Sequence, residues 1–522
     1  MFDFVIRGGT VIDGTRANRF RADVGIRADR IESVGDLRES ASRELIDAAG
    51  KIVAPGFVDV HNHSDGWMLK TTHLEAKTRQ GFTTEVLAAD GISYAPVNQF
   101  TATHWLKYLR ALNALEPDEY QGWKSLHEYM QAIDGRNVQN AMTHIPYANI
   151  RSMVCGWGRQ AVDDFQMRQI QYEIRRAMQD GAVGLSTGLD YIVQCFATTD
   201  ELVEACSAMA EFGGLYVTHV RYKKGLLPAV KEAVEIGRRA GVPVHISHLK
   251  APSPRQADEM LDYIDRVARH EVDFSFDVYP YQPGSTMLSY LLPYDVFEDG
   301  PLAACENLAS PETRARFAEG LKSYRLDMDH VRFAWIGSEK NAPHVNKTLN
   351  QYTRDCGVPI AQALCDLLVE EQLAVLCVMD EGDDALVHPF LQHDLYMMGS
   401  DGIYFPNGFV HPRVYGSAGR LLGRCVRDWK LFSLEDAVHK LSGRAAERFG
   451  LKDRGVIRQG NFADLVVFDA EKVIDPATYA EPHQMTVGIE HVLVNGRPII
   501  RDAEICQPAS APLPGRYVKF HK

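Results

Sequence analysis

The sequence lacks the features that mark several large protein classes. Its nine cysteines are an odd number and none stands in a C-x-x-C pair, so we expect neither a disulfide framework nor a zinc ribbon. No run reaches the ~18 apolar residues that a membrane helix needs. Residues 1–4 do not start the basic region, followed by an apolar region, that marks a signal peptide. We therefore expect a cytoplasmic protein with reduced thiols and no membrane partner.

Positive charge is also scarce. The 522 residues include 56 lysines and arginines against 69 aspartates and glutamates, which gives a net charge of −13. Binding of nucleic acid needs a basic face, so this balance predicts no nucleic-acid partner. The hydrophobic content of 45% and charged content of 24% are those of a folded globular protein. We expect a small-molecule substrate, and a homo-oligomer stays open.

Both ends of the chain have the pattern of short strands. Near the N-terminus, brief β-rich runs alternate with glycine turns. Near the C-terminus, Asn495-Gly496 separates two apolar runs, which is the strongest short-range signal of a hairpin. We expect the two ends, residues 1–55 and 446–522, to pair into one small β-sandwich domain.

Residues 56–445 repeat a different pattern, in which an apolar strand, a polar loop and an amphipathic helix follow one another. Eight such strands are expected at 53–60, 83–88, 140–144, 183–187, 215–220, 242–247, 272–279 and 395–399. Eight βα units predict an α/β fold, a (β/α)8 barrel with its functional residues at the C-terminal ends of the strands. The span near 290–390 is too long for one crossover, so it is expected to be an insertion with extra helices and a candidate lid.

Histidines and one aspartate close four of these strands. His61 and His63 follow the first strand, and residues two apart in a strand face the same side. His219, His248 and Asp401 close the fifth, sixth and eighth strands. A single histidine at a strand end is more often a hydrogen-bonded rim residue than a ligand. The joint pattern of imidazoles and a carboxylate, however, suits Zn²⁺ and similar divalent ions, and it predicts a metal site at one rim of the barrel.

This order of residues, H-x-H, then H, H and D, is similar to that of the amidohydrolase superfamily of metal-dependent hydrolases. More narrowly, the chain resembles the N-acyl-D-amino-acid deacylase (D-aminoacylase) family. The strings that carry the resemblance are 55–63, 184–191, 277–281 with Ser285-Thr286, 399–402 followed by 411–413, and 461–466. The resemblance spans nearly the whole chain. It implies a hydrolase that cleaves the amide bond of N-acyl-D-amino acids to a D-amino acid and a carboxylate.

The resemblance also implies which residues bind metal. His219 and His248 would hold the tighter of one or two divalent ions, together with a side chain from the end of strand two. His61, His63 and Asp401 would form the second, weaker position. Zn²⁺ is the expected metal.

One string departs from the family. The deacylases end strand two with Asn-Cys-Gly-Ile-Ser and use the thiolate as a metal ligand, whereas residues 89–93 here read Ala-Asp-Gly-Ile-Ser. Asp-Gly is a common turn, so Asp90 is either a turn residue or a ligand that bridges two metals. We favour the ligand. Because oxygen is a harder ligand than sulfur, Mn²⁺, Co²⁺ and Fe²⁺ become candidates beside Zn²⁺.

Catalytic roles follow from the same resemblance. Asp401 would be the general base toward a metal-activated water and then the general acid toward the leaving nitrogen. Tyr191 or His63 would stabilise the oxyanion. The candidates for gripping the substrate's carboxylate are Lys250, Tyr281, Ser285 and Arg413. Arginine suits this task because its fork binds a carboxylate with two hydrogen bonds.

Three alternatives stay open. A mononuclear amino-heterocycle deaminase shares the histidines and Asp401 and needs no bridging ligand, so it gains ground if Asp90 does not touch metal. A cyclic amidase of the same superfamily is disfavoured because strand four, at residues 185–191, ends without the lysine that such enzymes modify. Outside the enzymes, the alternative is a metal-free binding or scaffold protein on a degenerate barrel.

Overall fold

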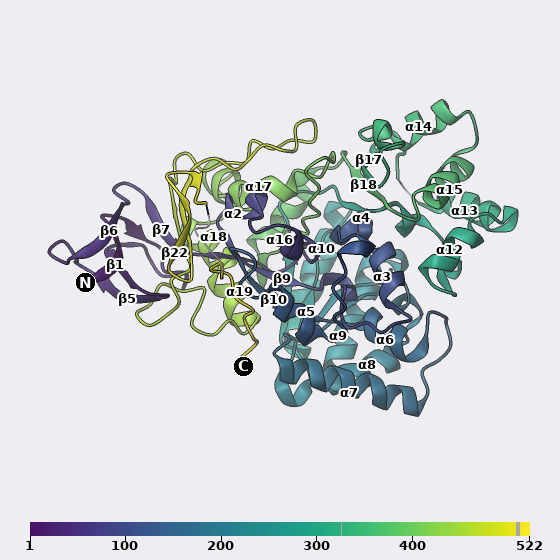
Figure 1. Cartoon of the computed structure of the whole chain (residues 1–522), viewed down its shortest axis with the longest axis horizontal. Coiled ribbons are helices and arrows are strands. Elements are labelled where there is room, and N and C mark those ends of the chain that lie inside the picture. The colour runs from purple at the N-terminus through teal and green to yellow at the C-terminus, as the bar shows by residue number, and fades with distance from the viewer. Residues whose placement is uncertain (325, 508–511, 522) are drawn as a thin grey trace.

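The computed structural model describes residues 1–324, 326–507 and 512–521. A small β domain lies at one end of the molecule, the barrel lies in the middle, and the segment that contains α12 to α15 lies at the far end (Figure 1). The N-terminal strands and the late strand β22 lie on the same side of the barrel, although more than 400 residues of the chain lie between them (Figure 1).

Two sheets form the β domain, with strand orders β5-β4-β1-β6 and β23-β22-β21-β20-β7-β2-β3. Their strands are β1 (Phe2–Arg7), β2 (Thr10–Val11), β3 (Phe20–Arg21), β4 (Asp23–Arg27), β5 (Arg30–Gly35), β6 (Ser42–Asp47), β7 (Ile52–Pro55), β20 (Leu465–Phe468), β21 (Ile489–Val494), β22 (Arg497–Arg501) and β23 (Glu504–Ile505). Ile6, Val24 and Leu465 share one buried cluster between the sheets. The pairing of β20 with β7 confirms that both chain ends build one sandwich.

The barrel strands occur close to the eight predicted positions. They are β8 (Phe57–Asp59), β9 (Phe82–Leu87), β10 (Asn140–Thr143) continued by β11 (Ile145–Pro146), β12 (Leu185–Gly188), β13 (Tyr216–His219), β14 (Val244–Ile246), β15 (Phe274–Val278) and β19 (Tyr396–Met398). All their pairings are parallel, in the orders β10-β9-β8 and β11-β12-β13-β14-β15-β19. The ring closes where the Asp401 N–H donates to the His61 carbonyl at 2.8 Å. The predicted barrel is therefore confirmed.

One predicted strand, 53–60, is divided between the two domains. Its first half is β7 of the sandwich and its second half is β8 of the barrel. Gly56 separates them, and a Cβ atom there would collide with Oγ1 of Thr83. The chain can pass from one sheet to the other at this point because glycine lets β9 approach closely.

Helices cover the barrel and close the end at which its strands begin. The longer ones are α5 (Leu126–Ile133), α6 (Tyr147–Cys155), α7 (Asp164–Asp180), α8 (Thr199–Ser207), α9 (Leu226–Ala240), α10 (Pro254–Tyr263), α17 (Arg413–Arg420) and α18 (Leu434–Leu441). α9 buries Val230 and Ala233 on one face and ends at Gly241, whose φ is 70°. After the short α19 (Gly443–Arg448), Phe449 packs with barrel residues such as Met142 in one cluster, so the barrel is filled and not a pore.

The segment between β15 and β19 is more than a set of helices. It contains α12 (Pro301–Asn307), α13 (Pro311–Ser323), α14 (Leu349–Cys356) and α15 (Ile360–Glu370), which confirms the expected helices. It also contains an antiparallel sheet, ordered β16-β18-β17, of β16 (Ser285–Met287), β17 (Val331–Ile336) and β18 (Val375–Met379), which the sequence did not predict. We keep the division into 1–55, 56–445 and 446–522 as a proposal. None of the helices that the structure describes is both long enough and apolar enough to cross a membrane.

Candidate metal centre

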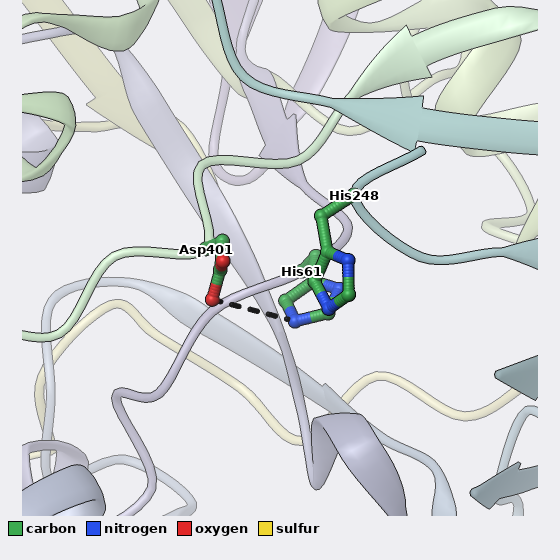
Figure 2. Close-up of side chains that lie close together, drawn as sticks. All are labelled: His61, His248 and Asp401. Carbon is green, nitrogen blue, oxygen red and sulfur yellow. Dashed lines mark ion pairs between the residues drawn. The ribbon is translucent and has the colours of Figure 1, made fainter. Parts of the chain in front are cut away.

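The structure brings all six predicted metal-binding side chains together at the C-terminal rim of the barrel. They are His61 and His63 after β8, Asp90 in the turn after β9, His219 at the end of β13, His248 after β14 and Asp401 after β19. His63 Nε2 lies 3.2 Å from Asp401 Oδ1, and His219 Nδ1 lies 3.0 Å from His248 Nε2. Figure 2 shows the side chains of His61, His248 and Asp401 close together; each residue follows a different strand.

Asp90 lies between the two pairs of histidines. Its Oδ1 is 3.6 Å from His61 Nε2 and 3.8 Å from His248 Nε2. Its Oδ2 is 3.7 Å from His63 Nε2 and 4.0 Å from His219 Nδ1. One carboxylate thus reaches all four imidazoles, which is the placement that a bridging ligand requires.

The donor set fits divalent metal ions. Three groups, His61-His63-Asp90, Asp90-His219-His248 and His61-His248-Asp401, each offer ligand atoms within 4.8 Å of one another. His61 Nε2 and Asp90 Oδ1 are buried and have no hydrogen-bond partner among the described residues. Unpartnered buried polar atoms cost free energy, and atoms that face a shared centre are satisfied by a cation. Imidazole nitrogens and carboxylate oxygens are the ligands of Zn²⁺ and its neighbours.

The backbone is strained where it presents three of these side chains. Asp90, His248 and Asp401 have φ angles of 56°, 39° and 50°. The left-handed region costs a non-glycine residue about 1–2 kcal/mol, so the surrounding structure must impose it. Gln194 Nε2 donates to the Asp90 carbonyl at 2.8 Å, and the His248 N–H donates to Asp277 at 2.8 Å.

Two acidic residues that were not predicted from the sequence contact ring nitrogens of His61 and His219. Asp277 Oδ2 lies 3.6 Å from His61 Nδ1 and 2.9 Å from His245 Nε2. Asp190 Oδ2 lies 3.4 Å from His219 Nε2. Such carboxylates fix the orientation and tautomer of a metal-binding imidazole. Asp277 is the last residue but one of β15, and Asp190 lies two residues after the end of β12, so an acid near a strand end in the strings already noted was the available signal.

The charges of the centre compensate one another. Burial alone would raise the pKa of Asp401, but the Arg413 guanidinium and His63 hold it well below its usual range. The pKa of Asp90 is also lowered, by His61 and His248, against the effect of its burial. Asp277 and Asp90 outweigh burial at His61 and raise its pKa to about 10. The pocket therefore favours net positive charge beside its carboxylates, which a divalent cation supplies.

Two of the predicted carboxylate-gripping residues meet at a tyrosine. Arg413 Nη1 lies 2.8 Å from Asp401 Oδ2, and its guanidinium lies 4.4 Å from the ring centre of Tyr279. Lys250 Nζ donates to the Tyr279 hydroxyl at 2.5 Å and to the Gln282 carbonyl at 2.8 Å. Burial and the nearby Arg413 lower the pKa of Lys250 to about 7. Tyr279 was not singled out, although it lies in the 277–281 string.

The other two predicted substrate residues form hydrogen bonds to groups outside the metal centre. The Tyr281 hydroxyl donates to Asp475 at 3.1 Å, and Ser285 Oγ donates to the Cys377 carbonyl at 2.7 Å. Tyr191 lies beside the centre, with its ring 5.0 Å from that of His219 and its hydroxyl 3.0 Å from Thr286 Oγ1. The roles of all three residues stay predictions.

Comparison with known proteins agrees with this geometry. A family model described as "Amidohydrolase family" matches residues 44–307 and 391–500, and the unmatched stretch falls in the insertion. D-aminoacylase of Alcaligenes xylosoxydans xylosoxydans is 34% identical over 510 residues, which cover 95% of this chain and 94% of that protein. The chain belongs to the amidohydrolase family and, within it, to the N-acyl-D-amino-acid deacylase (D-aminoacylase) family.

Solved structures support the same placement. N-acyl-D-glutamate deacylase from Bordetella bronchiseptica, complexed with zinc and a phosphonate inhibitor that mimics the tetrahedral intermediate, has a TM-score of 0.83 at 32% identity, covering 99% of each chain. A D-aminoacylase structure concerned with a binuclear metal centre has a TM-score of 0.82 at 32% identity, covering 99% of this chain and 100% of that chain.

Proposed function

We propose that this amidohydrolase cleaves N-acyl-D-amino acids to a D-amino acid and a carboxylate. The observation that carries the proposal is the rim centre itself, in which Asp90 reaches all four histidines and Asp401 lies beside Arg413. The similar D-aminoacylase and N-acyl-D-glutamate deacylase give the stereochemistry and the linear amide as the expectation for this chain.

The residues proposed to hold metal fall into two sets that share Asp90. His219 and His248 form one position with it, and His61 and His63 form the other. Asp401 adds a carboxylate at the edge of the second position. Zn²⁺ is the expected ion, with Mn²⁺, Co²⁺ and Fe²⁺ as candidates because every ligand is nitrogen or oxygen. When bound, a divalent ion lowers the pKa of water and polarises a carbonyl.

The remaining chemistry rests on side chains of this chain. Asp401 is ionised because Arg413 stabilises its carboxylate, so it is suited to accept a proton from water at Oδ1 and to pass that proton to the leaving nitrogen. Tyr191 and His63 are the proposed donors to the oxyanion. Lys250 and Arg413 are the proposed anchors of the substrate's carboxylate, since both side chains can donate hydrogen bonds beside Tyr279 and Arg413 carries a positive charge.

A screen of matched substrates tests the proposal. Purified protein is dialysed against chelator, loaded with Zn²⁺, Mn²⁺ or Co²⁺, and assayed for amine release from N-acetyl-D- and N-acetyl-L-amino acids. We expect release from D-substrates, and activity that depends on the added metal. Release from L-substrates alone would refute the stereochemical claim.

A further inference from the structure

A lysine lies near the metal centre, and a tyrosine ring contacts both this lysine and one of the histidines. Lys223 belongs to the 3-10 turn η5 (Tyr222–Lys224), which follows β13. Its ammonium lies 4.2 Å from the ring centre of Tyr290 and 4.5 Å from that of Tyr294. The Tyr290 ring in turn lies 6.3 Å from the ring of His219. Lys223 therefore lies on the His219 side of the centre, with the Tyr290 ring in contact with both residues.

The positive charge of this lysine is only partly compensated, by the rings of Tyr290 and Tyr294 and at longer range by Asp190. Its Nζ donates one hydrogen bond, to the Tyr290 carbonyl at 2.8 Å, and it forms no ion pair with a carboxylate of the described residues. Asp190, the acid beside it, is occupied by His219 and accepts from the hydroxyls of Tyr290 at 3.2 Å and Tyr294 at 2.7 Å. An ammonium has three donors, so two remain for a ligand.

The surroundings of Lys223 keep the charge available. Partial burial among the tyrosine rings lowers the pKa of Lys223 to about 8, which still leaves most of the group protonated at pH 7. The side chain remains exposed to solvent, so a substrate can reach it. Tyr290 and Tyr294 come from the 3-10 turns η7 (Leu288–Leu291) and η8 (Tyr294–Phe297), at the start of the insertion.

The site thus has cations on two separate walls. Arg413 and Lys250 flank Tyr279 on the wall that continues from β14, β15 and β19. Lys223 lies on the wall that follows β13, beside residues at the end of β12. In the proposed function, one carboxylate of the substrate needs the first wall only. The second wall is left with an unpaired ammonium and aromatic rings that suit a short methylene chain.

We propose that Lys223 binds a second carboxylate of the substrate, so that the preferred N-acyl-D-amino acid is a diacid. The second acid group is carried either by the amino-acid side chain or by the far end of the acyl group. This inference rests on the proposed function, because it takes the amide carbonyl to lie at the histidines and the first carboxylate at Arg413.

Three substrates and three variants test the inference. The substrates are N-acetyl-D-alanine, N-acetyl-D-glutamate and N-succinyl-D-alanine, which differ in the presence and place of the second carboxylate. The wild-type protein is expected to have the highest kcat/KM for one of the two diacids, and which one identifies the source of the acid. Lys223→Met is expected to lower the kcat/KM ratio of that diacid to N-acetyl-D-alanine about 10- to 100-fold, the loss expected for a hydrogen-bonded charge.

The variants separate recognition from a structural role. Lys223→Arg keeps the positive charge and is expected to keep most of the ratio. Lys224→Met removes the neighbouring exposed charge of the same turn and is expected to leave the ratio unchanged. If Lys223→Met lowers kcat/KM equally for all three substrates, Lys223 only fastens the loop to the insertion, and the inference is wrong. A wild-type preference for N-acetyl-D-alanine overturns it as well.

Binding measurements keep this inference separate from the proposed function. If the wild-type protein hydrolyses no N-acyl-D-amino acid, the proposed function fails. Calorimetry with N-succinyl-D-alanine and N-acetyl-D-alanine still decides the role of Lys223. Tighter binding of the diacid to the wild type, lost in Lys223→Met, supports a second-carboxylate site. The same titration is made with N-acetyl-D-glutamate, and Kd values for both diacids equal to that of N-acetyl-D-alanine overturn it.

Discussion

Arg413 Nη1 lies 2.8 Å from Asp401 Oδ2, and both side chains are buried. The other oxygen of Asp401, Oδ1, faces His63 Nε2 at 3.2 Å and His61 Nε2 at 3.7 Å. One carboxylate thus has an anchored oxygen and an oxygen that points into the centre. This division explains how a buried aspartate stays ionised where a proton acceptor is needed, since an opposite charge nearby favours the charged form.

Arg413→Lys tests whether the arginine anchors one oxygen of Asp401. Lysine keeps the charge but loses the planar fork that can hold Asp401 and a substrate carboxylate at once. We expect kcat/KM for N-acetyl-D-amino acids to fall by at least about tenfold, as for one charged hydrogen bond, while the metal content stays unchanged. Steady-state kinetics and elemental analysis measure both. Kinetic constants equal to those of an exposed control, Arg38→Lys, would contradict the assignment.

Asp90→Ala tests the bridging position. Each set of histidines would lose its shared carboxylate, so we expect the metal retained after dialysis to fall by half or more, measured by elemental analysis. Asp90→Cys replaces a hard oxygen with a soft sulfur and should shift retention from Mn²⁺ toward Zn²⁺. The exposed acid Asp258, which belongs to none of the possible metal-binding groups, gives a matched control as Asp258→Ala. Wild-type metal content in Asp90→Ala would show that Asp90 is a turn residue only.

Lys77→Met tests a buried charge network beneath the centre. Lys77 is buried against Asp59, lies 3.5 Å from Glu85 Oε2, and donates to Ser400 Oγ at 2.7 Å. Ser400 directly precedes Asp401 in the chain, and its N–H donates to Asp59 at 2.8 Å. Removing the cation that pairs with Asp59 and Glu85 should lower the free energy of unfolding by about 3–5 kcal/mol in urea titrations.

The partly exposed Lys70 supplies the control for this network. Lys70 pairs with Glu119 at 2.9 Å near the surface, so Lys70→Met should cost less than about 1 kcal/mol. A Lys77→Met protein as stable as Lys70→Met would mean that the buried charges of Asp59 and Glu85 are compensated in another way.

The buried His144 should make the protein less stable to unfolding at acidic pH. It lies fully buried between β10 and β11, and neither ring nitrogen has a hydrogen-bond partner among the described residues. Burial and the neighbouring His245 lower its pKa to about 3. Because the unfolded chain has the higher pKa, near 6.5, protons favour unfolding as the pH falls below that value.

The magnitude of the effect is testable by substitution. Between pH 6.5 and pH 4 this histidine should reduce stability by about 3 kcal/mol, since one pKa unit corresponds to ~1.4 kcal/mol. His144→Leu should therefore flatten the fall of Tm across that range by the corresponding amount. An unchanged Tm profile would show that His144 is protonated equally in both states. The exposed His270, substituted in the same way, is the control position.

Much of the centre was predictable because each ligand comes directly after, or at the end of, a strand that its own local sequence marks. His219 and His248 directly follow apolar runs, and the C-terminal ends of parallel strands share one rim, so the sequence alone brings them together. The sandwich was predictable for a similar reason, since Asn495-Gly496 marks its hairpin within a few residues.

The features that were not predicted depend on contacts between distant segments. Asp277 supports His61 although more than 200 residues separate them, and no local pattern records that pairing. β16 and β18 form one sheet across some 90 residues, and β16 has only three residues, too few to show alternation. Tyr279 is placed by Lys250 and Arg413 together, so its position follows from the fold and not from its own neighbours.

The kcat of Asp401→Asn is the most direct test of the account, which holds that this centre performs amide hydrolysis. Asparagine keeps the size and one oxygen but cannot accept the proton. With metal content measured in the same samples, kcat toward the best N-acyl-D-amino acid should fall by about 10²- to 10⁴-fold, the range for a general base. Hydrolysis at the wild-type rate by metal-loaded Asp401→Asn would contradict the account.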